Sequence, residues 1–209
     1  MIRKDGAKAP VRQDSRDTRH RLLAAAAAAI IEGSGEFEIG DVARRAQASV
    51  GLAYHHFGSK AGLLTALIDD FYSRHDAVAN QRLDTTLSWA IRERSRLRAS
   101  VEFMYADPLA PIIVGRLGGS AEVVALEAAH RAAMVEQASR NISEGQKTGQ
   151  IDKTIDATIA AAAIIGGIRQ AVATALASKK PPAREKLVRQ LWSFVAGGLQ
   201  LDQVDQLRS

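Results

Sequence analysis

The stretch IGDVARRAQASVGLAYHHFGSKAGL, residues 39–63, decides how the N-terminal part of the chain folds. Its first part places apolar residues at helical spacing, with an aspartate and two arginines on the other face. A tight turn follows around Ala46–Ala48, and Ser49 is a good N-cap for a second short helix over Val50–His56. Gly58 then breaks that helix. Two short helices joined by a tight turn form the pattern of a helix-turn-helix.

The second helix of this pattern carries a mixture of side chains that suits a DNA surface. In a helix-turn-helix the second helix enters the major groove, where hydroxyl, phenol and imidazole groups hydrogen-bond to phosphates and base edges. Gly51 has no side chain and allows close approach to DNA, whereas Phe57 is expected to anchor the helix in the hydrophobic core. The expected hydrogen-bonding groups belong to Ser49, Tyr54, His55, His56 and Lys60.

Residues 19 to about 71 resemble the DNA-binding domain of TetR-type (TetR/AcrR) transcriptional repressors. In that family an alanine-rich first helix precedes a segment of the form I-x-D-I-A-x-x-A-G-V-S-x-G-x-x-Y-x-H-F-x-S-K-x-x-L. The matching positions here are Ile39, Asp41, Val42, Ala43, Ala46, Ser49, Gly51, Tyr54, His56, Phe57, Ser59, Lys60 and Leu63.

The resemblance implies a set of residues that line DNA. On the second helix and just after it these are Ser49, Val50, Gly51, Tyr54, His55, His56 and Lys60. Arg44, Arg45 and Gln47 are expected to contribute from the first helix and the turn. Two alternatives remain open from the residues alone: the arginines form a solvated face, and His56 serves to fix the helix end.

Four positions depart from the family pattern. Gln47 replaces the usual turn glycine, so the turn must reach its conformation by another route. Glu38 stands where a Ser or Thr cap is common, and its carboxylate would repel phosphate unless it is held. Gly40 replaces a larger residue, and Gly62 replaces the acidic residue of a capping box, so Ser59 is expected to cap its helix alone.

Composition favours a soluble globular protein and argues against catalysis. The chain has 209 residues, a formal charge of +5 and no cysteine, which excludes disulfides, a thiol nucleophile and a zinc finger. Much of the positive charge lies between Arg3 and Arg21, a weak footprint for an anionic partner. The histidines show no metal-ligand spacing. We therefore expect a cytoplasmic, nucleoid-associated protein that is not an enzyme and has no metal or cofactor.

The remaining sequence is helical in rhythm and poor in strand signals, so the expected fold is all-α. We expect a flexible basic tail over 1–15, a helix-turn-helix DNA-binding domain over 16–62 and a helical ligand-binding and dimerisation domain over 63–209, with a helix at about 61–79 connecting them. Whether the tail reaches along the duplex or is only a disordered end stays open. The first helix is expected from Asp17, and later helices near 83–106, 111–117, 121–144, 154–177 and 183–201.

The most apolar stretch, Ile155–Ala177, has the composition of a membrane span at first sight. However, Asp156, Arg169 and Gln170 interrupt it and leave an uncharged run shorter than the ~20 residues that a spanning helix needs. We interpret it as a buried helix of a soluble protein.

A single helix-turn-helix reads only a short half-site, so specific binding favours a homodimer. The resemblance implies that the last two long helices form a four-helix bundle across a two-fold axis. The paired glycines at 166–167 would allow close helix packing, and an apolar seam follows 187–198. Ordinary packing within one chain is the alternative. The candidate interface residues are Ile164, Gly167, Ile168, Leu187, Leu191, Phe194, Val195 and Gly198.

The middle helices are then expected to enclose a cavity for a small-molecule effector. Candidate lining residues are Trp89, Phe103, Met104, Tyr105 and Met134, with Arg116, Glu127 and His130 as candidate polar anchors. Each could instead serve packing or lie on the surface. The expected function is a homodimeric repressor that binds a palindromic operator in double-stranded DNA and is released when the ligand moves the helix at 61–79. The alternative is a ligand-independent architectural or protein-interaction module with a solid core.

Overall fold

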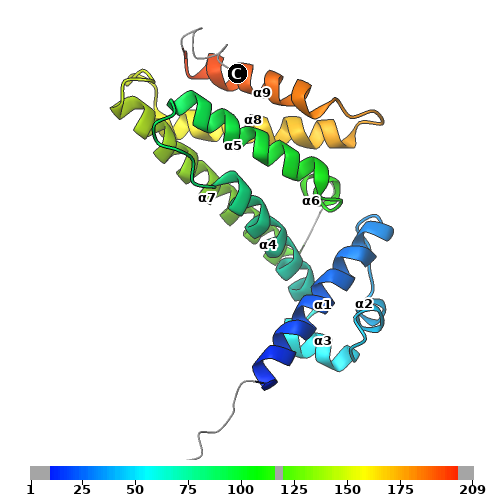
Figure 1. The fold of residues 1–209 in the computed structure, drawn as a ribbon. Helices are drawn as coiled ribbons and strands as arrows, with labels where there is room; N and C mark the ends of the chain where they lie inside the picture. Colours follow the sequence, from blue (N-terminus) through cyan, green and yellow to red (C-terminus); the bar gives the residue numbers. More distant parts are fainter. Residues whose placement is uncertain (1–9, 116–119, 202–209) are drawn as a thin grey trace, which may run out of the picture. The chain divides into compact units, whose positions relative to one another are not determined.

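A computed structural model describes residues 10–115 and 120–201, and every regular element in those ranges is a helix (Figure 1). This confirms the expected all-α class. The chain divides into two compact units, 1–69 and 70–209, and one helix crosses the boundary. The helices are α1 (Pro10–Glu32), α2 (Ile39–Arg45), α3 (Val50–Phe57), α4 (Lys60–Ala79), α5 (Trp89–Ala106), α6 (Ala110–Gly115), α7 (Ala121–Lys147), α8 (Ala157–Ala177) and α9 (Arg184–Gly198).

The first helix begins earlier than the sequence pattern predicts. α1 starts at Pro10 rather than Asp17, so residues 10–15 are helical. Proline suits the first position of a helix because its fixed φ is helical and its missing N–H would have no partner there. The rest of the expected tail, residues 1–9, lies outside the described part of the chain.

Two later helices begin where a polar side chain caps the backbone. α5 begins at Trp89 and not at Leu83, because Ser88 Oγ accepts the Ile91 N–H at 3.3 Å. The preceding residues form a turn, in which Asp84 Oδ1 accepts the Thr86 N–H at 2.9 Å. The same capping starts α8 at residue 157, three residues later than predicted. At the N-termini of α5 and α8, side-chain hydrogen bonds to free helical N–H groups therefore outweighed the helix propensity of the preceding residues.

The N-terminal unit has a small core of alanine and branched aliphatic residues. α1 packs on α2, and α2 packs on α3. Leu22, Ile30, Val42 and Leu63 are 0–1% exposed. The alanines between them let α1 approach its neighbours closely, because a methyl group occupies little space at a helix contact. The unit thereby holds the turn between α2 and α3 on a rigid base.

The C-terminal unit is built from the end of α4 and the five helices α5–α9. α7 packs on α8, α5 on α9, and α6 on α8. Figure 1 shows α5, α8 and α9 running alongside one another. Phe71 on α4 is fully buried and meets the Phe103 ring of α5 at 5.3 Å between centroids. The end of α4 is therefore part of this unit's core.

The apolar helix α8 is not buried within its own chain, contrary to expectation. It is 21 residues long with a mean hydropathy of 1.6, so length and composition alone would let it cross a membrane. Only 17% of the residues in its most apolar window are buried. Ile159 is 69% exposed. An apolar helix with an uncovered face indicates that something outside the single chain covers it.

Candidate functional site

The turn between α2 and α3 reaches its shape without a glycine. Gln47 has φ +52°, in the left-handed region that glycine usually occupies. The Ala48 N–H donates to Ala43 O at 2.9 Å and the Gln47 N–H donates to Arg44 O at 3.2 Å. This pair of bonds is the Schellman arrangement, which closes α2 and redirects the chain. Gln47 adopts this left-handed conformation at the expense of backbone strain.

α3 presents an exposed face that starts at its capped N-terminus. Ser49 Oγ accepts the Leu52 N–H at 3.1 Å, so the serine is the cap that the sequence predicts. Val50 is 43% exposed and Tyr54 48%, whereas Ala53 is buried against the unit. Gly51 is exposed, and a Cβ there would meet only Ser49 Oγ, at 3.9 Å. The hydroxyl of Tyr54 and the backbone around Gly51 are open to a partner.

The two arginines of α2 have different environments. Arg44 pairs with Asp41 at 2.6 Å, and both side chains are more than half exposed. Arg45 forms two hydrogen bonds to Glu32 of α1, at 2.9 and 2.6 Å. These bonds hold the pKa of the Glu32 carboxyl below its usual range. Arg45 thus ties α2 to α1, while Arg44 is the more available of the two.

Lys60 forms an ion pair with Glu38, which the sequence showed only as a departure from the family pattern. Its ammonium lies 3.2 Å from Glu38 Oε1 and 4.9 Å from the centroid of the Phe37 ring. Glu38 precedes α2 but makes no capping bond with its side chain. Because both charges are exposed, the pair is weak and a phosphate can displace the carboxylate. No local signal connects two residues 22 positions apart; only the fold does.

His56 and Phe57 end α3 on its inner side. Both are half-buried, and the Arg19 guanidinium of α1 lies 5.5 Å from the Phe57 ring centroid. Burial, followed by the positive charges of His55 and Arg19, lowers the pKa of His56. His55 is exposed beside it. Of the two histidines, His55 is better placed to contact DNA, and His56 is better placed to hold the end of α3.

The turn from α3 into α4 explains the glycine at position 62. Ser59 Oγ accepts the Gly62 N–H at 2.9 Å, so Ser59 caps α4 without a capping-box acid. A Cβ at position 62 would lie 2.0 Å from the carbonyl oxygen of Phe57. Only glycine fits there with the turn as it is. Gly40, by contrast, has open space around the position of a Cβ.

The C-terminal unit holds a cavity of about 340 Å³ between α4, α5, α7, α8 and α9. Of the predicted lining residues, Trp89 and Met134 contribute to it. A second cavity of about 50 Å³ is lined by Met104, Met134, Glu127 and His130 among others. The residues predicted to line one cavity are therefore divided between two, because spacing along a helix does not reveal which neighbour each face meets.

Two predicted lining residues lie away from both cavities, and a third is not described. Phe103 lines neither cavity, because its ring packs on Phe71 and His75. Tyr105 also lines neither, and its hydroxyl donates to Pro182 O at 3.0 Å. Arg116 lies outside the described residues.

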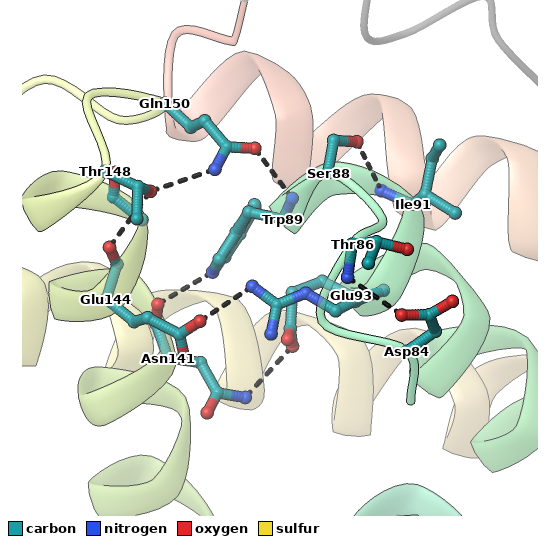
Figure 2. A network of polar contacts seen from close by, with 12 residues as sticks. Asp84, Thr86, Ser88, Trp89, Ile91, Glu93, Asn141, Glu144, Thr148 and Gln150 are labelled. Atoms are coloured by element: carbon teal, nitrogen blue, oxygen red, sulfur yellow. Dashed lines mark hydrogen bonds and ion pairs between the residues drawn. The ribbon is translucent and has the colours of Figure 1, made fainter. Parts of the chain in front are cut away.

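A polar network that sequence reasoning missed borders the larger cavity (Figure 2). The Trp89 N–H donates to Gln150 Oε1 and its indole N–H donates to Asn141 O, both at 2.7 Å. Asn141 Nδ2 donates to Glu93 Oε2 at 3.1 Å. The charged run RERSRLR, residues 92–98, was the available signal. By itself, however, a run of charged residues predicts a solvent-exposed helix face.

The smaller cavity is bordered by a second group of polar contacts. Tyr72 of α4 accepts a hydrogen bond from Arg169 of α8 at 2.9 Å, and its hydroxyl lies 3.4 Å from Glu127 of α7. Arg169 also pairs with Glu127 at 3.3 Å. Burial raises the pKa of Tyr72. These contacts join α4, α7 and α8 in the C-terminal unit.

The candidate interface residues fall into three groups. Leu187, Leu191 and Val195 are 5–6% exposed and belong to the chain's own core, which corrects their assignment to an open seam. They face inward because α9 packs on α5. Ile164 and Ile168 are half-buried and line the larger cavity. Phe194, Gly167 and Gly198 are the more open positions; Phe194 is 51% exposed, with its ring packed beside Gly167.

Comparison with known proteins places the N-terminal unit in a family. The model of the bacterial regulatory proteins of the tetR family matches residues 22–67. No curated protein matches the chain. Among solved structures, a TetR-family transcriptional regulator from Rhodococcus sp. is 25% identical and has a TM-score of 0.65, covering 88% of this chain and 99% of its own.

Two further solved structures are similar in fold. SmeT, the repressor of the Stenotrophomonas maltophilia multidrug efflux pump SmeDEF, is 16% identical, with a TM-score of 0.75 and coverage of 90% of this chain and 94% of its own. FadR from Bacillus subtilis, in complex with stearoyl-CoA, is 16% identical, with a TM-score of 0.69 and coverage of 86% and 98%. Residues 22–67 thus match the DNA-binding domain of the tetR family, and the helix-turn-helix with its helical second unit has the fold of TetR-family transcriptional regulators, which supports a DNA-binding regulator.

Proposed function

We propose that this protein is a homodimeric repressor that binds a palindromic operator at the nucleoid, in the cytoplasm, and leaves it when a small molecule enters the C-terminal unit. The observation that carries the DNA-binding part is the exposed face of α3. A capped N-terminus, an open backbone at Gly51 and a half-exposed Tyr54 lie on one helix, opposite the buried Ala53. Free N–H groups and a phenol are groups that bind phosphates and base edges.

The uncovered face of α8 and α9 supports the dimer. Ile159 and Phe194 are large apolar side chains that remain more than half exposed in the single chain. Gly166 and Gly197 have open space around them, so a second helix could approach the backbone closely. A two-fold dimer would cover these surfaces and present two copies of α3. Recognition helices about 34 Å apart can read two half-sites separated by one DNA turn.

The larger cavity favours a ligand-responsive regulator over a ligand-independent module with a solid core. Its volume of about 340 Å³ lies in the range of small-molecule sites. SmeT, of the same fold, is named as a repressor, and the similar FadR structure contains stearoyl-CoA. A solid-cored module would be packed at this place, so we favour the sensor.

α4 is the element through which a ligand would act on DNA binding. Its last turns line the larger cavity with His75, Asp76 and Ala79, and its first residue, Lys60, belongs to the DNA-binding surface. Arg74 of α4 is paired with Asp107, after α5, at 2.5 Å. A ligand that shifts α4 therefore acts on a continuous helix. A useful response needs a coupling of about 1–3 kcal/mol between the two sites.

The direct test is a DNA titration with the purified full chain. Fluorescence anisotropy would follow binding to the duplex upstream of the protein's own gene and to a scrambled duplex, at two salt concentrations. The proposal predicts saturable binding of two chains per duplex, weakened by salt and selective for the native sequence. Equal binding to both duplexes would support the architectural module instead.

The dimer is tested separately by sedimentation velocity. Phe194→Asp places a charge on the uncovered face and is expected to shift the wild-type dimer to single chains. Arg189→Asp changes an exposed residue five positions earlier on α9 and serves as the control. A wild-type protein that sediments as single chains at micromolar concentration would contradict the proposed dimer.

A further inference from the structure

The larger cavity has walls that restrict the chemistry of its ligand. Building on the ligand response proposed above, we propose that it binds a neutral, mostly apolar molecule of about two fused rings, held by a hydroxyl group between Glu93 and Arg96. The inference rests on the cavity's size, on the balance of charges in its wall and on the free hydrogen-bonding capacity of these two side chains.

The volume sets the size of the ligand. An apolar cavity of about 150 Å³ holds one benzene ring, so a cavity of about 340 Å³ suits about two rings. Most of the wall is aliphatic or aromatic, including Leu97, Ile142, Ile165, Trp192 and Leu199. Such a wall favours a compact apolar body because burying its surface contributes about 25 cal/mol per Å².

The charges in the wall favour a neutral ligand. Asp76 and Glu93 supply two carboxylates, and Arg96 and Arg140 supply two guanidiniums. Glu93 and Arg96 form an ion pair within α5, and their side chains are only 17% and 21% exposed. A charged ligand would place an uncompensated charge beside this largely buried pair, which is unfavourable.

Glu93 supplies an acceptor for a ligand donor. One carboxylate oxygen accepts from Arg96 and the other accepts from Asn141 Nδ2 at 3.1 Å. A carboxylate offers about four lone-pair sites, so two remain for a ligand. Burial raises the pKa of Glu93, consistent with a carboxylate that has lost hydration and gains from another donor. Arg96 has further N–H groups that can donate to the same ligand oxygen. A hydroxyl fits because it both donates and accepts.

The supporting shell holds Glu93 in place. Asn141, which donates to Glu93, accepts from Gln137 Nε2 through its side-chain oxygen at 2.9 Å. Its backbone oxygen accepts the Trp89 indole N–H, and the Trp89 backbone is held by Gln150 (Figure 2). Because its partners are fixed before a ligand arrives, the carboxylate is preorganised for binding.

The chain contains its own reporter for this cavity. It has two tryptophans, Trp89 and Trp192, and both line the larger cavity. Intrinsic tryptophan fluorescence therefore reports on this cavity. Tetralin-based probes absorb little at wavelengths that excite only tryptophan. Their affinity can therefore be measured by tryptophan fluorescence and checked by isothermal titration calorimetry.

The test compares three probes of one shape on the full chain without DNA. They are tetralin, tetralin with a hydroxyl on its aromatic ring, and tetralin with a carboxylate at the same position. We expect hydroxytetralin to bind at least about tenfold more tightly than either of the others, because a hydrogen bond to a charged group is lost in tetralin and a charge is added in the carboxylate. Equal affinity for tetralin, tighter binding of the carboxylate, or no saturable binding of hydroxytetralin would overturn the proposal.

Substitution at Glu93 gives a second, gain-of-affinity readout. Glu93→Gln leaves the Arg96 charge uncompensated, so the carboxylate probe should bind at least about tenfold more tightly than it binds the wild type. Hydroxytetralin should lose affinity. Glu102→Gln, an exposed glutamate on the same helix that does not line the cavity, should leave all three affinities unchanged. A Glu93→Gln protein with unchanged probe preference would contradict the assignment of the anchor.

Filling the cavity locates the binding. Ala138 lines the cavity, and Ala138→Phe should abolish tryptophan quenching by hydroxytetralin. Undiminished binding would place the probe elsewhere and overturn the proposal. Release of DNA is measured in a separate titration. If the probe order is as expected but no probe releases DNA, the ligand chemistry stands and the proposed sensor function fails.

Discussion

The two units of this molecule differ in how their working surfaces are made. In the N-terminal unit, residues close together in sequence form the candidate DNA surface: the turn at Gln47, the cap at Ser49 and the exposed Tyr54 lie within eight positions. In the C-terminal unit, the cavity wall comes from five helices, and its polar network joins residues 50 and more positions apart, such as Trp89 and Asn141. A local surface can be read from a motif, whereas a cavity requires the packing.

The largest expected effect tests the core of the C-terminal unit. Phe71 is fully buried, so Phe71→Ala should lower the free energy of unfolding by about 3–5 kcal/mol, measured by urea titration. Phe194→Ala truncates a ring that is 51% exposed and should cost far less in the single chain. If the two substitutions were equally destabilising in protein that sediments as single chains, Phe194 would be part of the chain's own core and the uncovered face would not exist.

The next effect concerns the turn into α4. Gly62→Ala places a methyl group against the Phe57 carbonyl and should destabilise the N-terminal unit by about 1–3 kcal/mol. Gly40→Ala is the matched control, because its Cβ meets open space in a helix, and it should stabilise by about 0.5–1 kcal/mol. Thermal unfolding of both variants would decide this, and a tolerated Gly62→Ala would show that the turn can relax.

A smaller gain is expected at the α2–α3 turn. Gln47→Gly removes the strain of a left-handed residue with a side chain and should raise the free energy of unfolding by about 0.5–1 kcal/mol. Gln47→Ala keeps that strain and should not stabilise. If Gln47→Gly also weakens binding to the upstream duplex, the amide contributes to DNA recognition; stability below the wild-type value would argue against the strained turn.

The smallest effect probes the carboxylate beside the DNA surface. Glu38→Gln removes the partner of Lys60 and should strengthen DNA binding by up to about fivefold, since the exposed pair is weak and competes with phosphate. Glu36→Gln, two residues earlier, is the control for net charge alone. An equal gain in both variants would mean that long-range repulsion acts, rather than competition for Lys60.

These differences also set the limit of sequence-based prediction for this chain. The helix-turn-helix, the Ser49 cap and the all-α class could be predicted, because each depends on contacts within a few residues. The start of α5 was missed because Ser88 and the turn at Asp84 outweighed a continuous apolar rhythm. The role of Glu93 was missed because burial of a charged helix face depends on which helices cover it.

The central claim is that α3 reads DNA through the groups exposed on its outer face. The most direct measurement is an anisotropy titration of the upstream duplex with ligand-free wild type, Tyr54→Phe and Tyr105→Phe. Removing the Tyr54 hydroxyl should weaken binding by about three- to tenfold, because one hydrogen bond to DNA is lost. Removing the Tyr105 hydroxyl, which donates to Pro182 O in the C-terminal unit, should leave binding unchanged. Wild-type affinity in Tyr54→Phe, or an equal loss in both variants, would contradict this account.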